Sequence, residues 1–153
     1  MNKDPNMVLP DERAQMERVY RAWDTAIAAG DISSLVNLYA PDAEIESPLI
    51  YEFTASKTGV LRGREAFRAL YQEVARQQSN VIRPKHHDDY LVRGHRIIWE
   101  YARVTQSGDQ SEFVESWDFN DRYEIRCHRV YWGWSRIANL SRKGFGARPE
   151  RGA

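Results

Sequence analysis

Three apolar runs joined by short turns fill residues 96–134, which read RIIWEYARVTQSGDQSEFVESWDFNDRYEIRCHRVYWGW. Apolar and polar residues tend to alternate along these runs, which is the pattern of half-buried strands. The pairs Ser107-Gly108 and Asn120-Asp121 separate the runs, and connections this short join antiparallel neighbours. Together with one more run upstream, the pattern predicts an antiparallel meander of four strands, at about 82–92, 96–105, 111–119 and 124–134.

Helical patterns precede the meander. Apolar residues from Met16 to Ile27 recur at the spacing of one helix face, and Gly30 stands where a left-handed cap would end the helix. We expect a first helix over residues 10–29, a short second helix that ends before Pro41, and a third helix over 64–77. Helices first and a meander afterwards predict an α+β fold, with about three N-terminal helices on one face of a curved sheet.

Residues 48–62 have no clean period between the second and third helices. They include Pro48 and Gly59, and the segment 43–47 before them alternates like a strand. We predict a long loop here, and long loops over a scaffold often act as lids.

The composition fits one globular domain. The chain has 153 residues, with 22 Lys plus Arg balanced by 22 Asp plus Glu, which argues against nucleic-acid binding. No apolar run approaches the ~20 residues of a membrane span, so no membrane role is expected. The single cysteine, Cys127, and a charged N-terminal segment without a secretory signal predict a cytoplasmic protein.

We expect three segments: an N-terminal tail over 1–9, a domain over 10–134 and a basic C-terminal tail over 135–153. The last segment carries five Arg or Lys residues against one Glu. Two interpretations of it stay open, a frayed end or a segment docked on a partner subunit or over the mouth of a pocket.

Glu115 lies where the strand alternation is clearest. Phe113, Trp117 and Phe119 share its face, and such an aromatic face is predicted to be buried. An unpaired carboxylate there would cost several kcal/mol or take up a proton. Two interpretations stay open: a structural Glu satisfied by an Arg or a hydroxyl, or a pocket carboxyl whose raised pKa suits acid–base work or hydrogen-bond donation.

Glu100 is a candidate partner of Glu115. If Ser107-Gly108 is a two-residue hairpin loop, the register places Glu100 opposite Glu115 on the same face. Two carboxyls that share a site cannot both be ionised without a large cost in free energy. The pKa of one is therefore raised, so that one carboxyl can act as the acid and the other as the base. A one-residue error in the turn would instead place Glu100 on the outer face.

Histidines are the other polar candidates. In the last strand run, periodicity alone does not choose between the face of His128 and the face of Cys127. Residues 86–89 read HHDD and offer metal-ligating side chains, but adjacent strand residues point to opposite faces and no third ligand is identified. We therefore expect no metal site. There is also no Gly-rich phosphate loop in the sequence.

Three stretches carry a family resemblance: Val19–Asp31 (VYRAWDTAIAAGD), Leu35–Pro48 (LVNLYAPDAEIESP) and Arg62–Phe67 (RGREAF). In this order and spacing they resemble the SnoaL-like branch of the nuclear-transport-factor-2-like superfamily, over about residues 10–134. The resemblance implies a cone-shaped, curved antiparallel sheet capped by helices, an enclosed apolar pocket, and usually a homodimer. The superfamily includes ketosteroid isomerases, polyketide cyclases, dehydratases, epoxide hydrolases and non-catalytic binders, so the fold does not fix the function.

The resemblance also implies roles for single residues. Glu115, in the stretch Val114–Asn120, falls at the position of the protonated oxyanion-hole aspartate of ketosteroid isomerases. An inward face of His128, Val130 and Trp132 is favoured, and polyketide cyclases of the SnoaL type keep an acid–base residue on this last strand. Trp23 and Leu70 would line the pocket from the helices.

Two departures from the isomerase pattern argue against steroid isomerisation by the standard route. The isomerase base is an Asp followed by Pro, where this chain has Ser47-Pro48. The oxyanion tyrosine of the first helix corresponds to Trp23.

We therefore expect a small-molecule pocket protein, leaning towards a cofactor-independent acid–base enzyme of the isomerase, aldol cyclase or dehydratase type. Its substrate would be small, apolar and cyclic or polyketide-like. Glu115 is the candidate acid or hydrogen-bond donor, and Glu100 or His128 the candidate base. The candidate substrate-binding residues are Trp23, Ser47, Leu70, Trp117, Val130 and Trp132. The alternative is a non-catalytic ligand-binding or dimerisation module of the same fold.

Overall fold

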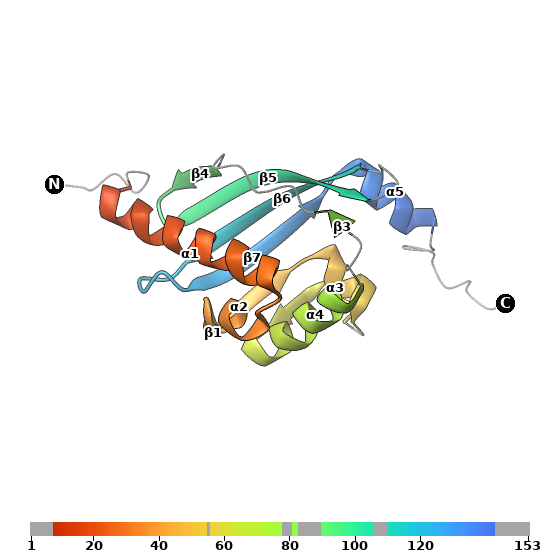
Figure 1. Ribbon diagram of the computed structural model, residues 1–153, viewed down its shortest axis with the longest axis horizontal. Helices are drawn as coiled ribbons and strands as arrows, with labels where there is room; N and C mark the ends of the chain where they lie inside the picture. Colours follow the sequence, from red (N-terminus) through yellow and green to blue (C-terminus); the bar gives the residue numbers. More distant parts are fainter. Residues whose placement is uncertain (1–7, 55, 78–80, 83–89, 106–109, 143–153) are drawn as a thin grey trace.

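The computed structural model of the chain describes residues 8–54, 56–77, 81–82, 90–105 and 110–142. A seven-stranded sheet and a set of helices make up the molecule (Figure 1). This confirms the α+β class and the N-terminal helices. In chain order the elements are α1 (Pro10–Ala29), α2 (Ile32–Asn37), β1 (Tyr39–Glu46), α3 (Pro48–Phe53), β2 (Val60–Arg62), α4 (Arg64–Gln77), β3 (Val81–Ile82), β4 (Tyr90–Arg93), β5 (Arg96–Thr105), β6 (Gln110–Phe119), β7 (Ile125–Trp132) and α5 (Trp134–Arg142).

Helix α1 has the predicted boundaries because both of its ends carry local signals. Pro10 occupies the first turn, and the Glu12 carboxylate accepts a hydrogen bond from the Leu9 backbone N–H at 2.9 Å. Gly30 ends the helix with φ 67°, a left-handed conformation that glycine adopts without steric cost.

Aromatic side chains fill the space between α1 and the sheet. The ring centroids of Tyr20 and Trp99 lie 5.2 Å apart, and those of Trp23 and Trp117 lie 5.3 Å apart. Trp99 and Trp117 meet edge to face at 4.6 Å on the neighbouring strands β5 and β6. All four side chains are buried, so α1 is fixed on the sheet by a tryptophan-rich core.

The strand order of the sheet is β2-β1-β7-β6-β5-β3, and β4 also pairs with β5. The predicted antiparallel meander is present in β4 to β7. Strand β1 lies outside this meander and runs parallel to β7. The predicted run over 82–92 overlaps two short strands, β3 (Val81–Ile82) and β4 (Tyr90–Arg93), and residues 83–89 between them lie outside the described residues.

The register of β5 and β6 corrects one prediction. Trp99 pairs with Glu115, and Glu100 pairs with Val114. Because Val104 pairs with Gln110, an odd number of residues separates the two. The predicted two-residue hairpin required an even number, so the observed register is shifted by one residue. Glu100 is therefore on the outer face and exposed, and the prediction that it shares a site with Glu115 is wrong.

The predicted loop over 48–62 is also wrong, because most of it is helix α3 and strand β2. The Ser47 hydroxyl accepts a hydrogen bond from the Leu49 backbone N–H at 3.2 Å, and Pro48 occupies the first turn of α3. Strand β2 then pairs antiparallel with β1.

The interpretation of residues 135–142 as a frayed end is wrong, because they belong to α5. The Gly133 N–H donates to the Glu112 carbonyl at 2.8 Å, and the Arg136 guanidinium lies 4.7 Å from the ring centroid of Trp132. A Cβ at Gly133 would meet the Glu112 Cβ at 2.9 Å, so this turn requires a residue without a side chain.

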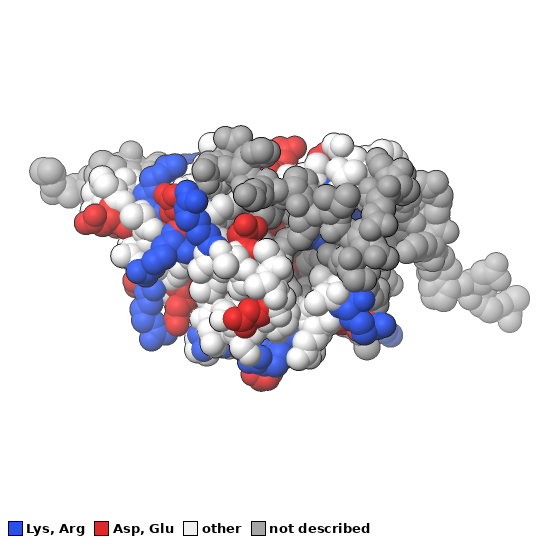
Figure 2. Space-filling model, in the orientation of Figure 1, with Lys and Arg blue, Asp and Glu red and all other residues white. Residues whose placement is uncertain are grey.

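Charged side chains of both signs are interspersed over the face shown in Figure 2. On the helices some of them form pairs, such as Arg21 with Glu17 at 2.7 Å and Arg76 with Glu73 at 2.6 Å. Exposed pairs of this kind contribute little stability. No described helix is long and apolar enough to cross a membrane.

Candidate functional site

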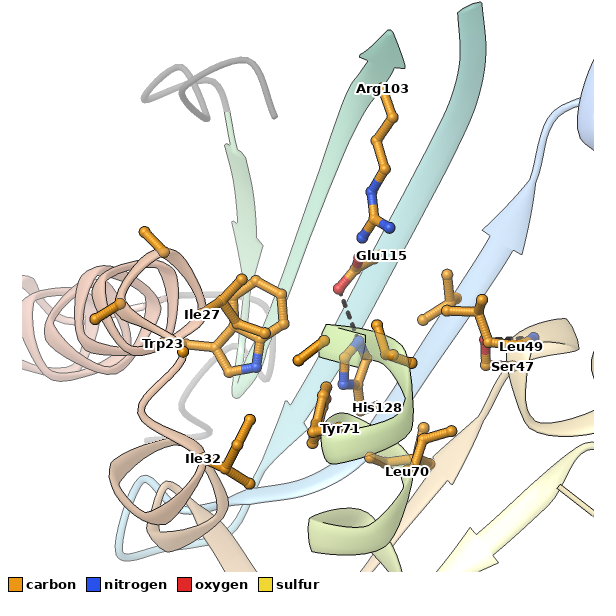
Figure 3. Close-up of a pocket in the computed structure, with 17 residues that line it drawn as sticks. Trp23, Ile27, Ile32, Ser47, Leu49, Leu70, Tyr71, Arg103, Glu115 and His128 are labelled. Atoms are coloured by element: carbon orange, nitrogen blue, oxygen red, sulfur yellow. Dashed lines mark hydrogen bonds and ion pairs between the residues drawn. The ribbon is translucent and has the colours of Figure 1, made fainter. Parts of the chain in front are cut away.

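A cavity of about 410 Å³ lies between the helices and the sheet (Figure 3). Its size is within the range of ~300–1,000 Å³ that is usual for small-molecule sites. Its wall is mostly apolar, which is typical of sites that bind hydrophobic ligands. The large apolar residues that line it are Trp23, Ile27, Ile32, Ile45, Leu49, Leu70, Val74 and Val130.

The polar side chains of the wall are few and come mainly from the sheet. They are Ser47, Tyr71, Arg103, Glu115 and His128. In Figure 3, Glu115 and His128 lie in the middle of the lining, with Trp23 on one side and Ser47 on the other. Among the described lining residues, Glu115 is the only carboxylate and His128 the only imidazole, and the sheet places them next to each other.

Glu115 and His128 form a buried pair across the neighbouring strands β6 and β7. The Glu115 Oε2 atom lies 2.8 Å from His128 Nε2, and both side chains are 3% exposed. The register brings them together, because Trp117 pairs with His128 and Glu115 pairs with Val130 on the same face. A charge this deeply buried needs such a partner.

Glu115 is ionised. Its other carboxylate oxygen accepts a hydrogen bond from the Tyr101 hydroxyl, which in turn accepts one from Arg103 at 3.1 Å. Burial raises the pKa of Glu115, but the hydrogen bond and charge of His128, the Tyr101 hydrogen bond and the Arg103 charge outweigh burial and lower it to about 2. The expectation of a raised pKa and a protonated Glu115 that donates a hydrogen bond is therefore wrong.

Two tyrosines continue the network on the other side of His128. The Tyr39 hydroxyl lies 2.8 Å from His128 Nδ1 and 2.6 Å from the Tyr71 hydroxyl, and the Trp23 indole N–H donates to it at 3.2 Å. Burial, together with Tyr71 and the charge of Glu115, raises the pKa of Tyr39 well above its ordinary value. The Tyr39 hydroxyl therefore keeps its proton at neutral pH.

Six of the nine predicted site residues line the cavity: Glu115, His128, Trp23, Ser47, Leu70 and Val130. Trp117 and Trp132 are not among its lining residues, which corrects those two predictions. Trp117 is fully buried behind His128, with ring centroids 5.7 Å apart. Trp132 packs at 6.1 Å from Phe113 in a separate small cluster. The burial of His128, Val130 and Trp132 confirms the inward face that the resemblance favoured.

Sequence reasoning missed Tyr39, Tyr71, Tyr101 and Arg103. Tyr71 lies in the apolar stripe of α4, where it was counted as a core residue like Leu70. A hydroxyl in such a stripe is the signal that could have marked it, because a buried Tyr O–H usually finds a polar partner. Strand alternation places Arg103 on the face of Trp99 and Tyr101, and an Arg there is as unusual as a Glu.

The part of the chain that the structure describes contains no group of three or more His, Cys, Asp or Glu side chains able to hold a metal ion. The pair Glu115 and His128 alone is too small a ligand set for a protein zinc site. Residues 86–89 lie outside the described residues.

Comparison with known proteins agrees with this architecture. A family model for the SnoaL-like domain matches residues 17–131. An NTF2-like protein of unknown function from Burkholderia pseudomallei superposes with a TM-score of 0.64 at 17% sequence identity, over 82% of this chain and 96% of that chain. No match was found among curated proteins.

Two similar structures have more informative descriptions. TerC, co-crystallised with polyporic acid, has a TM-score of 0.66 and 15% identity, over 82% of this chain and 97% of its own. SalBIII, an epoxide hydrolase/cyclase-like enzyme with a role in pyran ring formation in the polyether salinomycin, has a TM-score of 0.58 and 17% identity, over 81% of this chain and 95% of its own. At these identities the likeness shows a shared fold.

Proposed function

This chain belongs to the SnoaL-like domain family, and we propose that it is a cofactor-independent enzyme that moves a proton on a small, largely apolar substrate. Proteins of this fold family bind small ligands, and the family includes cyclase-like and epoxide-hydrolase-like enzymes. Fold alone does not assign a reaction, so the proposal depends on the site.

The observation that carries the proposal is the Glu115–His128 pair in the wall of an apolar cavity. An ionised carboxylate on one ring nitrogen fixes the orientation of an imidazole and stabilises the imidazolium that forms when the ring takes up a proton. We assign His128 as the group that accepts and returns the proton. Glu115 positions His128 and balances its charge, in place of the acid role expected from the sequence.

The surroundings of the pair support proton transfer beside a carbonyl. Trp23, Leu70 and Val130 give the wall an apolar surface, and low polarity strengthens hydrogen bonds to a developing oxyanion. Isomerisation, aldol cyclisation and dehydration all begin with such a step. A cyclic or polyketide-like substrate fits the apolar wall. In support, the fold neighbour TerC was co-crystallised with polyporic acid, and the fold neighbour SalBIII has a role in pyran ring formation in the polyether salinomycin.

A non-catalytic binding module is the second candidate. It is favoured by the completeness of the network, because both carboxylate oxygens of Glu115 and both ring nitrogens of His128 already have protein partners. In that case the pair would serve only to satisfy buried polar groups.

We also propose that the protein works in the cytoplasm as a homodimer. The sequence has a single cysteine, Cys127, which suits a reducing compartment, and burial raises the pKa of its thiol, which lowers its reactivity. Trp134 is 79% exposed and Tyr131 is 53% exposed, and exposed aromatic side chains often mark interfaces. Sedimentation equilibrium of the purified protein would measure the oligomeric state.

Exchange of α-protons in deuterated water tests the reaction class without knowledge of the natural substrate. A panel of cyclic ketones and aromatic polyketide mimics is incubated with the protein, and loss of the α-proton signal is followed by NMR. We expect accelerated exchange of at least one ketone, and a loss of about 100-fold or more in His128→Asn because a general base contributes ~10²–10⁴.

The matched control for this experiment is His95→Asn, since His95 is outside the cavity lining. It should exchange protons at the wild-type rate. If ketones bind in the cavity but exchange their α-protons no faster than in buffer, this result would contradict the proposed enzymatic function and support the non-catalytic binding module.

A further inference from the structure

We infer that the proton passes between the ligand and His128 through two tyrosines, with Tyr71 as the group that touches the ligand and Tyr39 as the link. The inference rests on the proposed function and adds the route to it. The Tyr71 hydroxyl lies 2.6 Å from that of Tyr39, which lies 2.8 Å from His128 Nδ1. Three polar groups from α4, β1 and β7 thus form one continuous chain of hydrogen bonds.

The position of each tyrosine in the chain of hydrogen bonds follows from burial. Tyr71 lines the cavity, whereas Tyr39 is fully buried and is not a lining residue. A ligand in the cavity can therefore contact Tyr71 and has no access to Tyr39. The His128 ring also lines the cavity, but its two nitrogens face Glu115 and Tyr39.

The hydrogen-bond capacity of the Tyr39 hydroxyl limits the network to two arrangements. A hydroxyl donates one hydrogen bond and accepts two, and the Trp23 N–H can only donate to it. When His128 is neutral with its proton on Nε2, Tyr71 donates to Tyr39 and Tyr39 donates to Nδ1. When His128 is protonated on both nitrogens, Nδ1–H donates to Tyr39 and Tyr39 donates to Tyr71.

These two arrangements differ by one proton on His128 and by the direction of both tyrosine hydroxyls. In the forward step the ligand's acidic proton goes to the Tyr71 oxygen, the Tyr71 proton goes to Tyr39, and the Tyr39 proton goes to Nδ1. No electrons are exchanged, and the products are a ligand anion and an imidazolium beside ionised Glu115. In the reverse step Tyr71 donates a proton back to the ligand.

The route defines the chemical class of the ligand. It requires an apolar body for the cavity wall and one weakly acidic group, either a phenol or enol O–H or the α C–H of a ketone, directed at Tyr71. For a phenol or enol O–H, the oxyanion forms on the atom that faces Tyr71, and it accepts a hydrogen bond best from a hydroxyl that can reverse its direction, which is what the second arrangement provides.

Binding of 2-naphthol to the full-length protein tests the route separately from turnover. Its absorbance distinguishes the bound phenol from the bound phenolate at a pH well below its own pKa in water, and ¹⁵N NMR of labelled histidine reports the protonation of His128. In the wild type we expect bound naphtholate together with doubly protonated His128.

Two variants remove one hydroxyl each, and Tyr51→Phe removes an exposed hydroxyl on α3, outside the cavity lining, as a control. In Tyr71→Phe and Tyr39→Phe the ionised fraction of bound naphthol should fall by about tenfold or more, since each loses one hydrogen bond of the route. A purely structural role would change affinity or thermal stability but would leave the ionised fraction of the bound ligand unchanged.

Equal ionisation of naphthol in the wild type and Tyr71→Phe would overturn the tyrosine route while leaving proton transfer to His128 intact. A wild-type protein that binds naphthol only in its neutral form, with an unchanged His128 spectrum, would contradict the proposed function itself. Failure of the wild type to bind naphthol would count against the ligand class that the route requires.

Discussion

Glu115 decides the chemistry of the site at the scale of single residues. Its carboxylate has two protein partners, Tyr101 and His128, and is 2% exposed. The structure therefore supports part of each of the two interpretations of Glu115 that the sequence left open. Glu115 is a satisfied buried acid, and it is also in the wall of the cavity.

Replacement of Glu115 by Gln is the first prediction. Gln keeps the shape but removes the negative charge, so we expect proton exchange to fall by about 100-fold or more. The unfolding free energy should fall by roughly 1–3 kcal/mol, because Tyr101 and His128 lose a charged acceptor. Denaturant unfolding and the ketone exchange assay measure the two effects.

Glu100→Gln is the control for this substitution. It makes the same chemical change one register position away, on an exposed residue of the outer face. We expect wild-type exchange and stability within about 0.5 kcal/mol. A loss of exchange in Glu100→Gln equal to that in Glu115→Gln would contradict the register-based assignment.

Strand alternation predicted the burial of Glu115 and the family resemblance favoured an inward His128, but neither predicted the charge of Glu115. Alternation of aromatic residues over 113–119 placed Glu115 on the core face. Its partners lie at sequence separations of 13 and 14 residues on β7 and β5, so they depend on strand register, and a one-residue change exchanges the two faces of a strand. The resemblance to ketosteroid isomerases suggested a protonated acid, whereas His128 and Arg103 here favour the ionised form.

At the scale of elements, two glycines test two different requirements. Gly30 needs a left-handed backbone, with φ 67°, and a Cβ there would have nothing within 4 Å. We predict that Gly30→Ala costs about 1–2 kcal/mol of unfolding free energy, because only the backbone conformation is penalised. Gly30→Asn should cost less, since Asn tolerates this conformation, and equal costs for both would contradict a conformational origin.

Gly133 tests close contact instead of backbone conformation. A Cβ at Gly133 would lie 2.9 Å from the Glu112 Cβ and 3.2 Å from the Glu112 carbonyl oxygen. We predict that Gly133→Ala lowers the unfolding free energy by roughly 1–3 kcal/mol through this overlap. Urea unfolding measures the change. The control is Ser135→Ala on the first turn of α5, which loses only an exposed hydrogen bond of 3.3 Å to the Gln110 carbonyl and should stay within about 0.5 kcal/mol of wild type.

Element boundaries were predictable where the signal is local. Helix α1 begins at Pro10 and ends at Gly30 as its sequence indicates. Helix α3 was missed because six residues are too few for a helical period to be recognised, although Ser47-Pro48 is a common helix start. The parallel pairing of β1 with β7 was not predictable, because no local signal connects strands from opposite ends of the chain.

At the scale of the whole molecule, the lowered pKa of Glu115 makes the unfolding free energy depend on pH in the acid range. Its folded value of about 2 lies below the ordinary value of 4.5, so the unfolded chain takes up the proton first as pH falls. The contribution of Glu115 to stability is full above pH 4.5 and is lost as pH falls through about 2. Its size is on the order of 3 kcal/mol.

Unfolding of the wild type and Glu115→Gln at a series of pH values checks this expectation. The stability difference between the two proteins should keep its full size above pH 4.5 and shrink as pH falls from there towards about 2. Asp118, held by Arg96 and Arg129 on the outer face, adds an acid dependence that is common to both proteins and cancels in the difference. A difference that stays constant with pH would contradict the lowered pKa.

The parallel contact between β1 and β7 also determines when the site can assemble. Tyr39 and His128 are 89 positions apart, and joining such distant segments requires closing a long loop, which is slow compared with forming the hairpins of the meander. On a ribosome, β1 emerges early and must wait for the last strand to be synthesised. The hydrogen-bond chain is therefore among the last parts of the native state to form, and a nascent protein that lacks β7 has no site, however well its helices have folded.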